Sequence, residues 1–245
     1  MAATTHPRQA PRRSPRTTGW WAKAWLRAVE EAAYDEADLR AGRRLARGGR
    51  VGGIIVDTGG YVAAVEDPRG AMTVSGTVPV LDEASSAALV ETVAATPGRV
   101  AALLAGELPH DLVEHAEQMG VELLPYGGEL AGVCTCDHWV YPCAHALAVL
   151  TQLGWLLDDD PLVLFALRGL PREELLARLH RLDLRRHDAR TPDATGEGSG
   201  EGPGGAVDDL DVALEAALRA ARMLREAEQG QALAGTEPGR WARGG

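Results

Sequence analysis

The residues best suited to chemistry in this chain are three cysteines and a histidine that lie close together. Over residues 133–150 the sequence reads VCTCDHWVYPCAHALAVL, and these are all the cysteines of the chain. The spacing is C-x-C-x6-C-x-H, and thiolate and imidazole are the ligands that Zn²⁺ takes in closed tetrahedral sites. The sequence therefore predicts a structural zinc site with four ligands, namely Cys134, Cys136, Cys143 and His145.

The local sequence is suited to bring these ligands together. A C-x-C pair can turn both thiolates toward one ion, and the six residues that follow can fold back as a knuckle, with Pro142 setting the turn. Cys143 and His145 then fall on the first turn of an apolar helix. The positive end of the helix dipole and the free N–H groups there favour thiolate over thiol.

Other interpretations of this cluster remain open at this point. The four residues could be buried by coincidence, or the C-x-C pair could be a redox switch, which would not need His145. A catalytic zinc is a third alternative, although four protein ligands leave no position for water. His138 is a rival ligand, or else is exposed or hydrogen-bonded to a ligand. Because the chain has no Ser-His-Asp order, nucleophile elbow or Walker pattern, we expect it not to be an enzyme.

The motif resembles the SWIM zinc finger, whose signature is C-x-C-x(n)-C-x-H, with n equal to six here. The chain from about residue 19 to about residue 182 also resembles bacterial SWIM-containing proteins, which show a Trp-Trp helix and a stretch like G-R-x-Y-A-R-x-G-x-V. That stretch runs here from Gly42 to Val51, and Leu45 stands where tyrosine is expected, so a stacking role of that ring is lost. The resemblance implies zinc binding and interaction with DNA or protein, often alongside helicase-like ATPases, and it implies no catalysis.

The elements that must position the ligands predict an α+β fold. It consists of a small antiparallel sheet packed with helices, followed by the Cys3His zinc knuckle and a helical C-terminal region. Three segments of β character at 51–57, 61–66 and 71–80 are separated by turn signals, which is typical of a meander. Shorter strands are predicted at 121–124 and 129–133. Apolar periodicity and capping residues predict helices at about 19–33, 82–95, 99–105, 109–119, 142–157, 161–167 and 171–184.

Composition shifts divide the chain into six expected regions. The central two are an N-terminal α+β region at 19–125 and the zinc finger with its following helices at 126–187. The flanking four are a disordered basic tail at 1–18, a Gly/Glu/Pro linker at 188–206, an amphipathic helix at 207–229 and a flexible tail at 230–245.

The charge distribution points to a basic front. The net charge is −10, but residues 1–50 carry 11 basic and 5 acidic side chains. We interpret residues 41–50 as a basic, Gly-rich connector that is solvated, with contact of its arginines to phosphate as the functional alternative. These candidate nucleic-acid contacts are Arg43, Arg44, Arg47 and Arg50. A second arginine group near the end of the 171–184 helix is explained by the helix dipole, with nucleic-acid contact as the alternative. It comprises Arg178, Arg181, Arg185 and Arg186.

Composition also bounds the class of protein. The longest nearly apolar run, residues 144–157, is shorter than a spanning helix, and the N-terminal residues lack the apolar stretch of a secretory signal, so we expect a cytoplasmic protein without membrane partners. The first hypothesis is a zinc-stabilised, non-catalytic module that binds nucleic acid, with DNA as the expected partner and no small-molecule substrate. The alternative is a protein–protein adaptor, for example for a helicase-like ATPase, because an amphipathic helix behind a linker is a common docking element.

Overall fold

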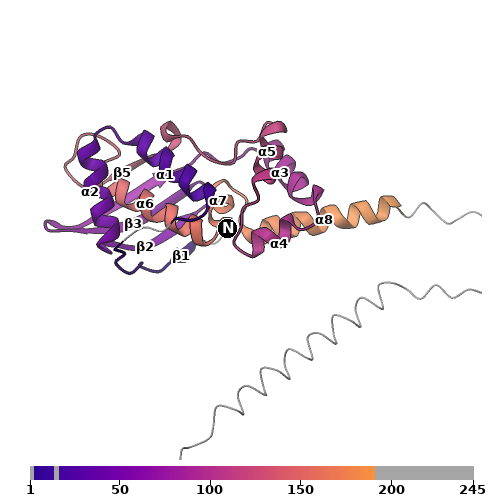
Figure 1. The fold of residues 1–245 in the computed structure, drawn as a ribbon, viewed down its shortest axis with the longest axis horizontal. Coiled ribbons are helices and arrows are strands. Elements are labelled where there is room, and N and C mark those ends of the chain that lie inside the picture. The colour runs from indigo at the N-terminus through magenta and orange to yellow at the C-terminus, as the bar shows by residue number, and fades with distance from the viewer. Residues whose placement is uncertain (1–2, 14–16, 191–245) are drawn as a thin grey trace, which may run out of the picture. The chain divides into compact units, whose positions relative to one another are not determined.

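A computed structural model describes residues 3–13 and 17–190 of the 245-residue chain. The predicted amphipathic helix at 207–229, the tail at 230–245 and most of the predicted linker lie outside the described residues. The described part combines a five-stranded antiparallel sheet with helices (Figure 1), so the predicted α+β class is confirmed.

The sheet is a simple meander in which strands adjacent in sequence are also adjacent in space. All four strand pairs are antiparallel, and the order is β1-β2-β3-β4-β5. Alternate residues of the three central strands are buried, as expected for a sheet with one covered face. The strands are β1 (Thr4–His6), β2 (Val51–Asp57), β3 (Gly60–Asp67), β4 (Gly70–Thr77) and β5 (Ala131–Cys134).

The predicted central strands are confirmed to within a few residues, but the predictions differ at the edges of the sheet. The segment 121–124 is not a strand, and β5 lies slightly later than the predicted 129–133. Disorder was predicted for residues 1–18, yet β1 pairs with β2, with Thr4 opposite Val56. Arg8 also binds Glu66 through two hydrogen bonds. The prediction is wrong at β1 because the stabilising partners are more than 40 residues away and leave no local signal.

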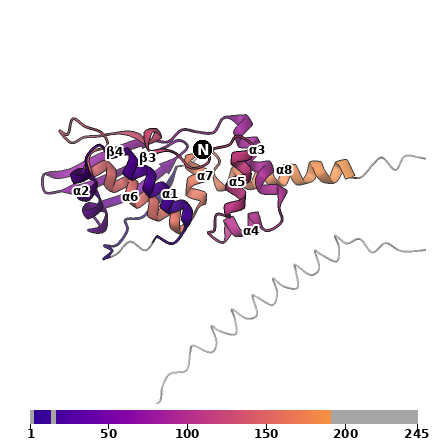
Figure 2. The same ribbon diagram turned by 45° about the horizontal axis from the view of Figure 1, so that its top comes forward.

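Helix α6 is the centre of the helical layer. It is buried along most of its length, and it packs against the sheet and against α1 and α2 (Figure 1). Helices α3, α4, α5 and α8 form a second group, which Figure 2 shows beside the sheet and α7. The helices are α1 (Trp20–Ala32), α2 (Glu36–Arg47), α3 (Glu83–Ala95), α4 (Arg99–Leu104), α5 (His110–Gln118), α6 (Ala144–Asp159), α7 (Leu162–Leu167) and α8 (Arg172–Arg190), with a 3-10 turn η1 (Gly127–Glu129).

Tryptophans attach α1 to α6. Trp21 and Trp25 are buried, and their indole N–H groups donate to the carbonyl oxygens of Leu157 and Leu150. Trp20 is partly buried and donates to Leu108. Trp21 and Trp25 therefore belong to the core, and Trp20 packs against it.

The connector predicted at 41–50 is wrong over most of its length, because residues 36–47 form helix α2. Asp35 caps its N-terminus by accepting a hydrogen bond from the Ala37 N–H. Leu39 and Ala46 are buried, and Gly42 allows the α2 backbone to approach α6 closely. Packing against α6 therefore outweighs the glycines and charges that suggested a loop.

In the part of the chain that the structure describes, no helix is long and apolar enough to cross a membrane.

Candidate metal centre

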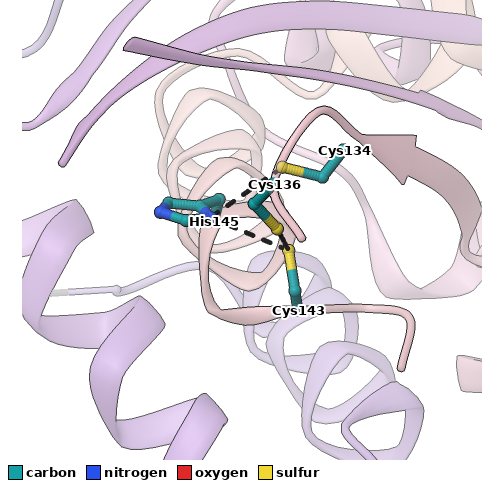
Figure 3. A group of neighbouring side chains, drawn as sticks. All are labelled: Cys134, Cys136, Cys143 and His145. Carbon is teal, nitrogen blue, oxygen red and sulfur yellow. Dashed lines mark hydrogen bonds between the residues drawn. The ribbon is translucent and has the colours of Figure 1, made fainter. Parts of the chain in front are cut away.

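The four predicted ligands converge at one point (Figure 3). Their ligand atoms all lie within 4.8 Å of one another. The Sγ atoms of Cys136 and Cys143 are 3.5 Å apart, and His145 Nδ1 lies 3.8 Å from Cys134 Sγ and 3.9 Å from Cys143 Sγ. Cys143 and His145 are buried, whereas the other two cysteines are half-buried.

These separations fit a tetrahedral zinc site. With zinc–sulfur bonds of about 2.3 Å and zinc–nitrogen bonds of about 2.0 Å, two ligand atoms on neighbouring corners of a tetrahedron are about 3.5–3.8 Å apart. The observed distances of 3.5, 3.8 and 3.9 Å lie in or close to that range. The donor set of three sulfurs and one nitrogen is a standard set for structural Zn²⁺. Residues Cys134, Cys136, Cys143 and His145 would therefore hold the ion.

The last strand of the sheet and the start of a helix supply three of the ligands, and Cys136 lies in the knuckle between them. Cys134 is the last residue of β5, and it pairs in register with Val74 of β4. Cys143 is the residue before α6, so its backbone begins that helix, and His145 lies on the first turn. The prediction that Cys143 and His145 fall at a helix N-terminus is confirmed. The sheet edge and the start of α6 therefore fix the two ends of the knuckle.

A glycine allows the strand before the knuckle to pack closely. A Cβ atom on Gly132 would collide with the Tyr141 hydroxyl and with the backbone of Ser75. Tyr141 belongs to the knuckle and is largely shielded from solvent, and this burial raises the pKa of its phenol to about 12. The knuckle is thus packed against β5 and is more than a loop around an ion.

Asp67 completes the site from a third element. Its Oδ2 lies 3.0 Å from His145 Nε2. Because His145 Nδ1 faces the sulfurs, Nε2 carries the proton and donates to the carboxylate, an arrangement that orients metal-binding histidines. The carboxylate also accepts hydrogen bonds from the backbone and side chain of Arg69, and these bonds with that from His145 hold the Asp67 pKa far below its ordinary value.

Sequence reasoning missed Asp67 in this role. The stretch Asp67-Pro68-Arg69-Gly70 is recognisable as a turn signal, and the structure confirms the turn between β3 and β4. Nothing in a turn signal indicates which other residue the aspartate will contact. The only usable hint was that a metal-binding histidine needs an acceptor for its second nitrogen.

The thiols differ in acidity within the metal-free cluster. Burial raises the pKa of Cys134 to about 12 and also raises that of Cys143. Burial opposes ionisation of Cys136 too, but interactions with the His138 backbone, His145 and the other two cysteines lower its pKa to about 7. Cys136 is therefore the thiol that ionises first, and two protons remain for a metal ion to displace.

His138 is not part of the ligand group. Its Nε2 lies 3.0 Å from Asp38 Oδ2 on α2, so this residue connects the knuckle to the basic helix. The geometry therefore does not support His138 as a zinc ligand, because its ring contacts Asp38 of α2 instead.

The four candidate arginines are split between two sides of α2. Arg44 and Arg50 line a cleft of about 480 Å³ beside the zinc ligands. Arg43 and Arg47 line a separate pocket of about 290 Å³ against α1 and α6, where Arg43 forms an ion pair with Glu30. In α8, Arg178 and Arg181 contact Glu174, which uses part of the second arginine group in ion pairs.

Comparison with known proteins agrees with this geometry. Residues 121–154 match the SWIM zinc finger family. The chain is 32% identical over 162 residues to the uncharacterized protein Rv2102 of Mycobacterium tuberculosis, and the match covers 65% of this chain and 58% of that relative. The chain thus aligns with less than two thirds of the relative's length. No solved structure is significantly similar to it. The Cys3His group lies within the segment 121–154, and the geometry and the family match together identify that segment as a SWIM zinc finger.

Proposed function

We propose that this protein is a non-catalytic nucleic-acid-binding module in which zinc holds the knuckle against the basic helix α2. The observation that carries the proposal is the cleft between α2, the β3–β4 turn and the knuckle. Three guanidinium groups line this cleft together with the zinc ligands Cys136, Cys143 and His145. The arginines come from three different segments, namely Arg44 from α2, Arg50 from the residue before β2 and Arg69 from the β3–β4 turn.

The carboxylates of the cleft are largely engaged already. Asp67 accepts hydrogen bonds from Arg69 and lies against His145, and Asp38 lies against His138. Asp137 is the remaining acidic residue of the lining.

Two arginines are left for a phosphate backbone. Arg44 makes no ion pair with any residue that the structure describes. Arg50 has only a long contact of 3.7 Å to Glu66, whose carboxylate is bound more closely by Arg8. Guanidinium groups of this kind are the usual partners of phosphate oxygens. The metal's part is structural: it would fix the knuckle wall of the cleft.

A second candidate function is a protein adaptor, and a different groove favours it. A groove of about 980 Å³ runs between α1 and the segment 117–126. Its lining mixes apolar and charged side chains, including Trp20, Lys23, Glu31 and the exposed Tyr126. Mixed lining with an exposed tyrosine is typical of protein interfaces. Such a partner would leave the arginine cleft free.

Salt dependence separates the two functions. The zinc-loaded full chain is titrated against fluorescein-labelled DNA, and anisotropy is followed at about 50 and about 200 mM salt, because counterion release makes phosphate binding fall steeply between these concentrations. The paired variant Arg44→Glu with Arg50→Glu is compared with Arg185→Glu, an exposed arginine of α8.

The proposal expects salt-sensitive binding that the Arg44/Arg50 pair weakens and that Arg185→Glu leaves largely unchanged. Loss of two phosphate contacts also lowers the salt slope by about two. Absence of binding at low salt would exclude the nucleic-acid function and leave the adaptor. Weakening by Arg185→Glu alone would instead place the contact on α8.

A further inference from the structure

The knuckle displays one large aromatic side chain directly to solvent. Trp139 is 88% exposed, whereas Trp21, Trp25 and Trp155 are buried and Trp20 is partly buried. Trp139 lies between the second and third cysteine ligands, within the six residues that separate them. Within residues 3–13 and 17–190 no core element covers its ring, so the side chain is available to a partner.

The loop that carries Trp139 is held on both sides. The preceding residue, His138, is engaged with Asp38 of α2 at 3.0 Å. After Trp139, Tyr141 packs its hydroxyl end against Gly132 of β5, and Cys143 begins α6. An exposed aromatic ring on a braced loop loses little conformational freedom when a ligand binds it.

Trp139 directly follows two residues that line the arginine cleft. Asp137 and His138, the two residues before Trp139, both line the cleft that contains Arg44, Arg50 and Arg69. An aromatic platform beside cationic side chains is the combination with which proteins bind single-stranded nucleic acids, because the ring stacks on a base while the cations follow the backbone.

We infer that the partner is a single-stranded nucleic acid that stacks an unpaired base on Trp139 and lays the adjoining phosphates along Arg44 and Arg50. This inference rests on the proposed nucleic-acid function and adds the strand state of the partner. In a duplex each base face is covered by its neighbours, so an exposed indole has no face to stack on. Unpaired bases of DNA and RNA offer the same face, and the 2′-hydroxyl is what distinguishes the two.

The test compares three variants of the zinc-loaded full chain. Trp139→Ala removes the stacking surface, and Trp139→Phe keeps a smaller one. Tyr34→Ala is the matched control, because Tyr34 is 79% exposed and lies between α1 and α2, outside the cleft lining. Each variant is titrated by anisotropy against an oligothymidylate, the matching RNA and a duplex, and zinc content is measured for each preparation.

The inference expects tighter binding to the single strand than to the duplex. Trp139→Ala should weaken single-strand binding about 5- to 150-fold, the equivalent of about 1–3 kcal/mol per stacked base. Trp139→Phe should fall between it and the unaltered protein, and Tyr34→Ala should have no effect. The oligothymidylate should also quench the fluorescence of the unaltered protein more than that of Trp139→Phe.

Three results would overturn the inference. Equal affinity of Trp139→Ala and the unaltered protein, with zinc content preserved in both, would show that the ring stacks on nothing. A preference for the duplex would assign another mode of binding while leaving the nucleic-acid function intact. Absence of binding to all three oligonucleotides at low salt would remove the proposed function and the inference together. Where single-strand binding is observed, the difference in affinity between the DNA and RNA strands identifies which polymer supplies the base.

Discussion

Asp67 Oδ2 lies 3.0 Å from His145 Nε2, although the two residues are 78 positions apart in the sequence. The contact joins the turn between β3 and β4 to the first turn of α6. Together with the pairing of Cys134 and Val74 across β5 and β4, it builds the zinc centre into the sheet. The finger in this protein is therefore one part of a larger fold, and its stability depends on residues outside residues 121–154.

Replacing Asp67 with asparagine should weaken zinc binding without removing a ligand. The amide is a poorer acceptor for the His145 N–H, and loss of such a partner typically costs about 10- to 100-fold in metal affinity. Competition with a chromophoric zinc chelator measures the change. Asp57→Asn, at the last residue of β2 before the β2–β3 turn, is the control and should keep the original affinity. Equal affinity in both variants would show that the carboxylate does not support the metal centre.

Removing a ligand should abolish stoichiometric zinc binding. We expect Cys136→Ala and His145→Ala to lose the metal and to disorder the knuckle over residues 130–150. The remaining helices and strands should persist, because most of the core that joins α1, α6 and the sheet consists of residues other than the four ligands. Metal analysis and amide hydrogen exchange measure the two effects. His138→Ala is the informative control, since its ring contacts Asp38, and it should retain one zinc per chain. Zinc loss in this control would return His138 to the ligand set.

Zinc affinity should rise with pH. Zinc binds thiolates, whereas burial raises the pKa of Cys134 to about 12 and raises that of Cys143, so both remain protonated near pH 8 without metal. Cys136, with a pKa of about 7, is mostly ionised there. Binding near pH 8 should therefore release about two protons, and affinity should change by about 100-fold per pH unit. Calorimetry in buffers of different ionisation enthalpy counts these protons, and a count near zero would mean that the thiols are already ionised.

Gly42→Ala should destabilise the protein, although alanine normally favours a helix by about 1 kcal/mol over glycine. The new Cβ would lie 2.8 Å from the Ala144 carbonyl oxygen and 2.8 Å from Leu147 Cβ, at the start of α6. Forced packing of this kind costs about 1–3 kcal/mol, so the steric effect should exceed the propensity gain. Gly128→Ala, which meets nothing within 4 Å, is the control. Denaturant unfolding of zinc-loaded protein measures both, and a more stable Gly42→Ala would show that α2 and α6 can separate without loss.

The ligands and the central sheet were predictable because their signals are local. Three cysteines and a histidine at finger spacing need only their own residues, and alternating β character between turn signals identifies β2, β3 and β4. The start of α6 was also predictable, because Cys143 and His145 precede an apolar run.

The remaining features depend on contacts between distant residues. Helix α2 looks like a loop because Gly42, Gly48 and Gly49 lie among arginines, and only the close approach to α6 explains Gly42. Strand β1 forms by pairing with the edge of β2, and the role of Asp67 depends on its contact with His145. The division of the arginines between two sides of α2 follows from that unpredicted helix. A single sequence contains no signal for these pairings.

The central claim is that zinc organises the surface that binds nucleic acid. Its most direct test is anisotropy of labelled single-stranded DNA with one preparation of the full chain, measured zinc-loaded, after chelation and after zinc is restored. The account predicts binding in the first state, loss of most binding in the second and recovery in the third, because the knuckle wall of the cleft depends on the metal. Equal binding with and without zinc would contradict it, since the surface would then form without the knuckle.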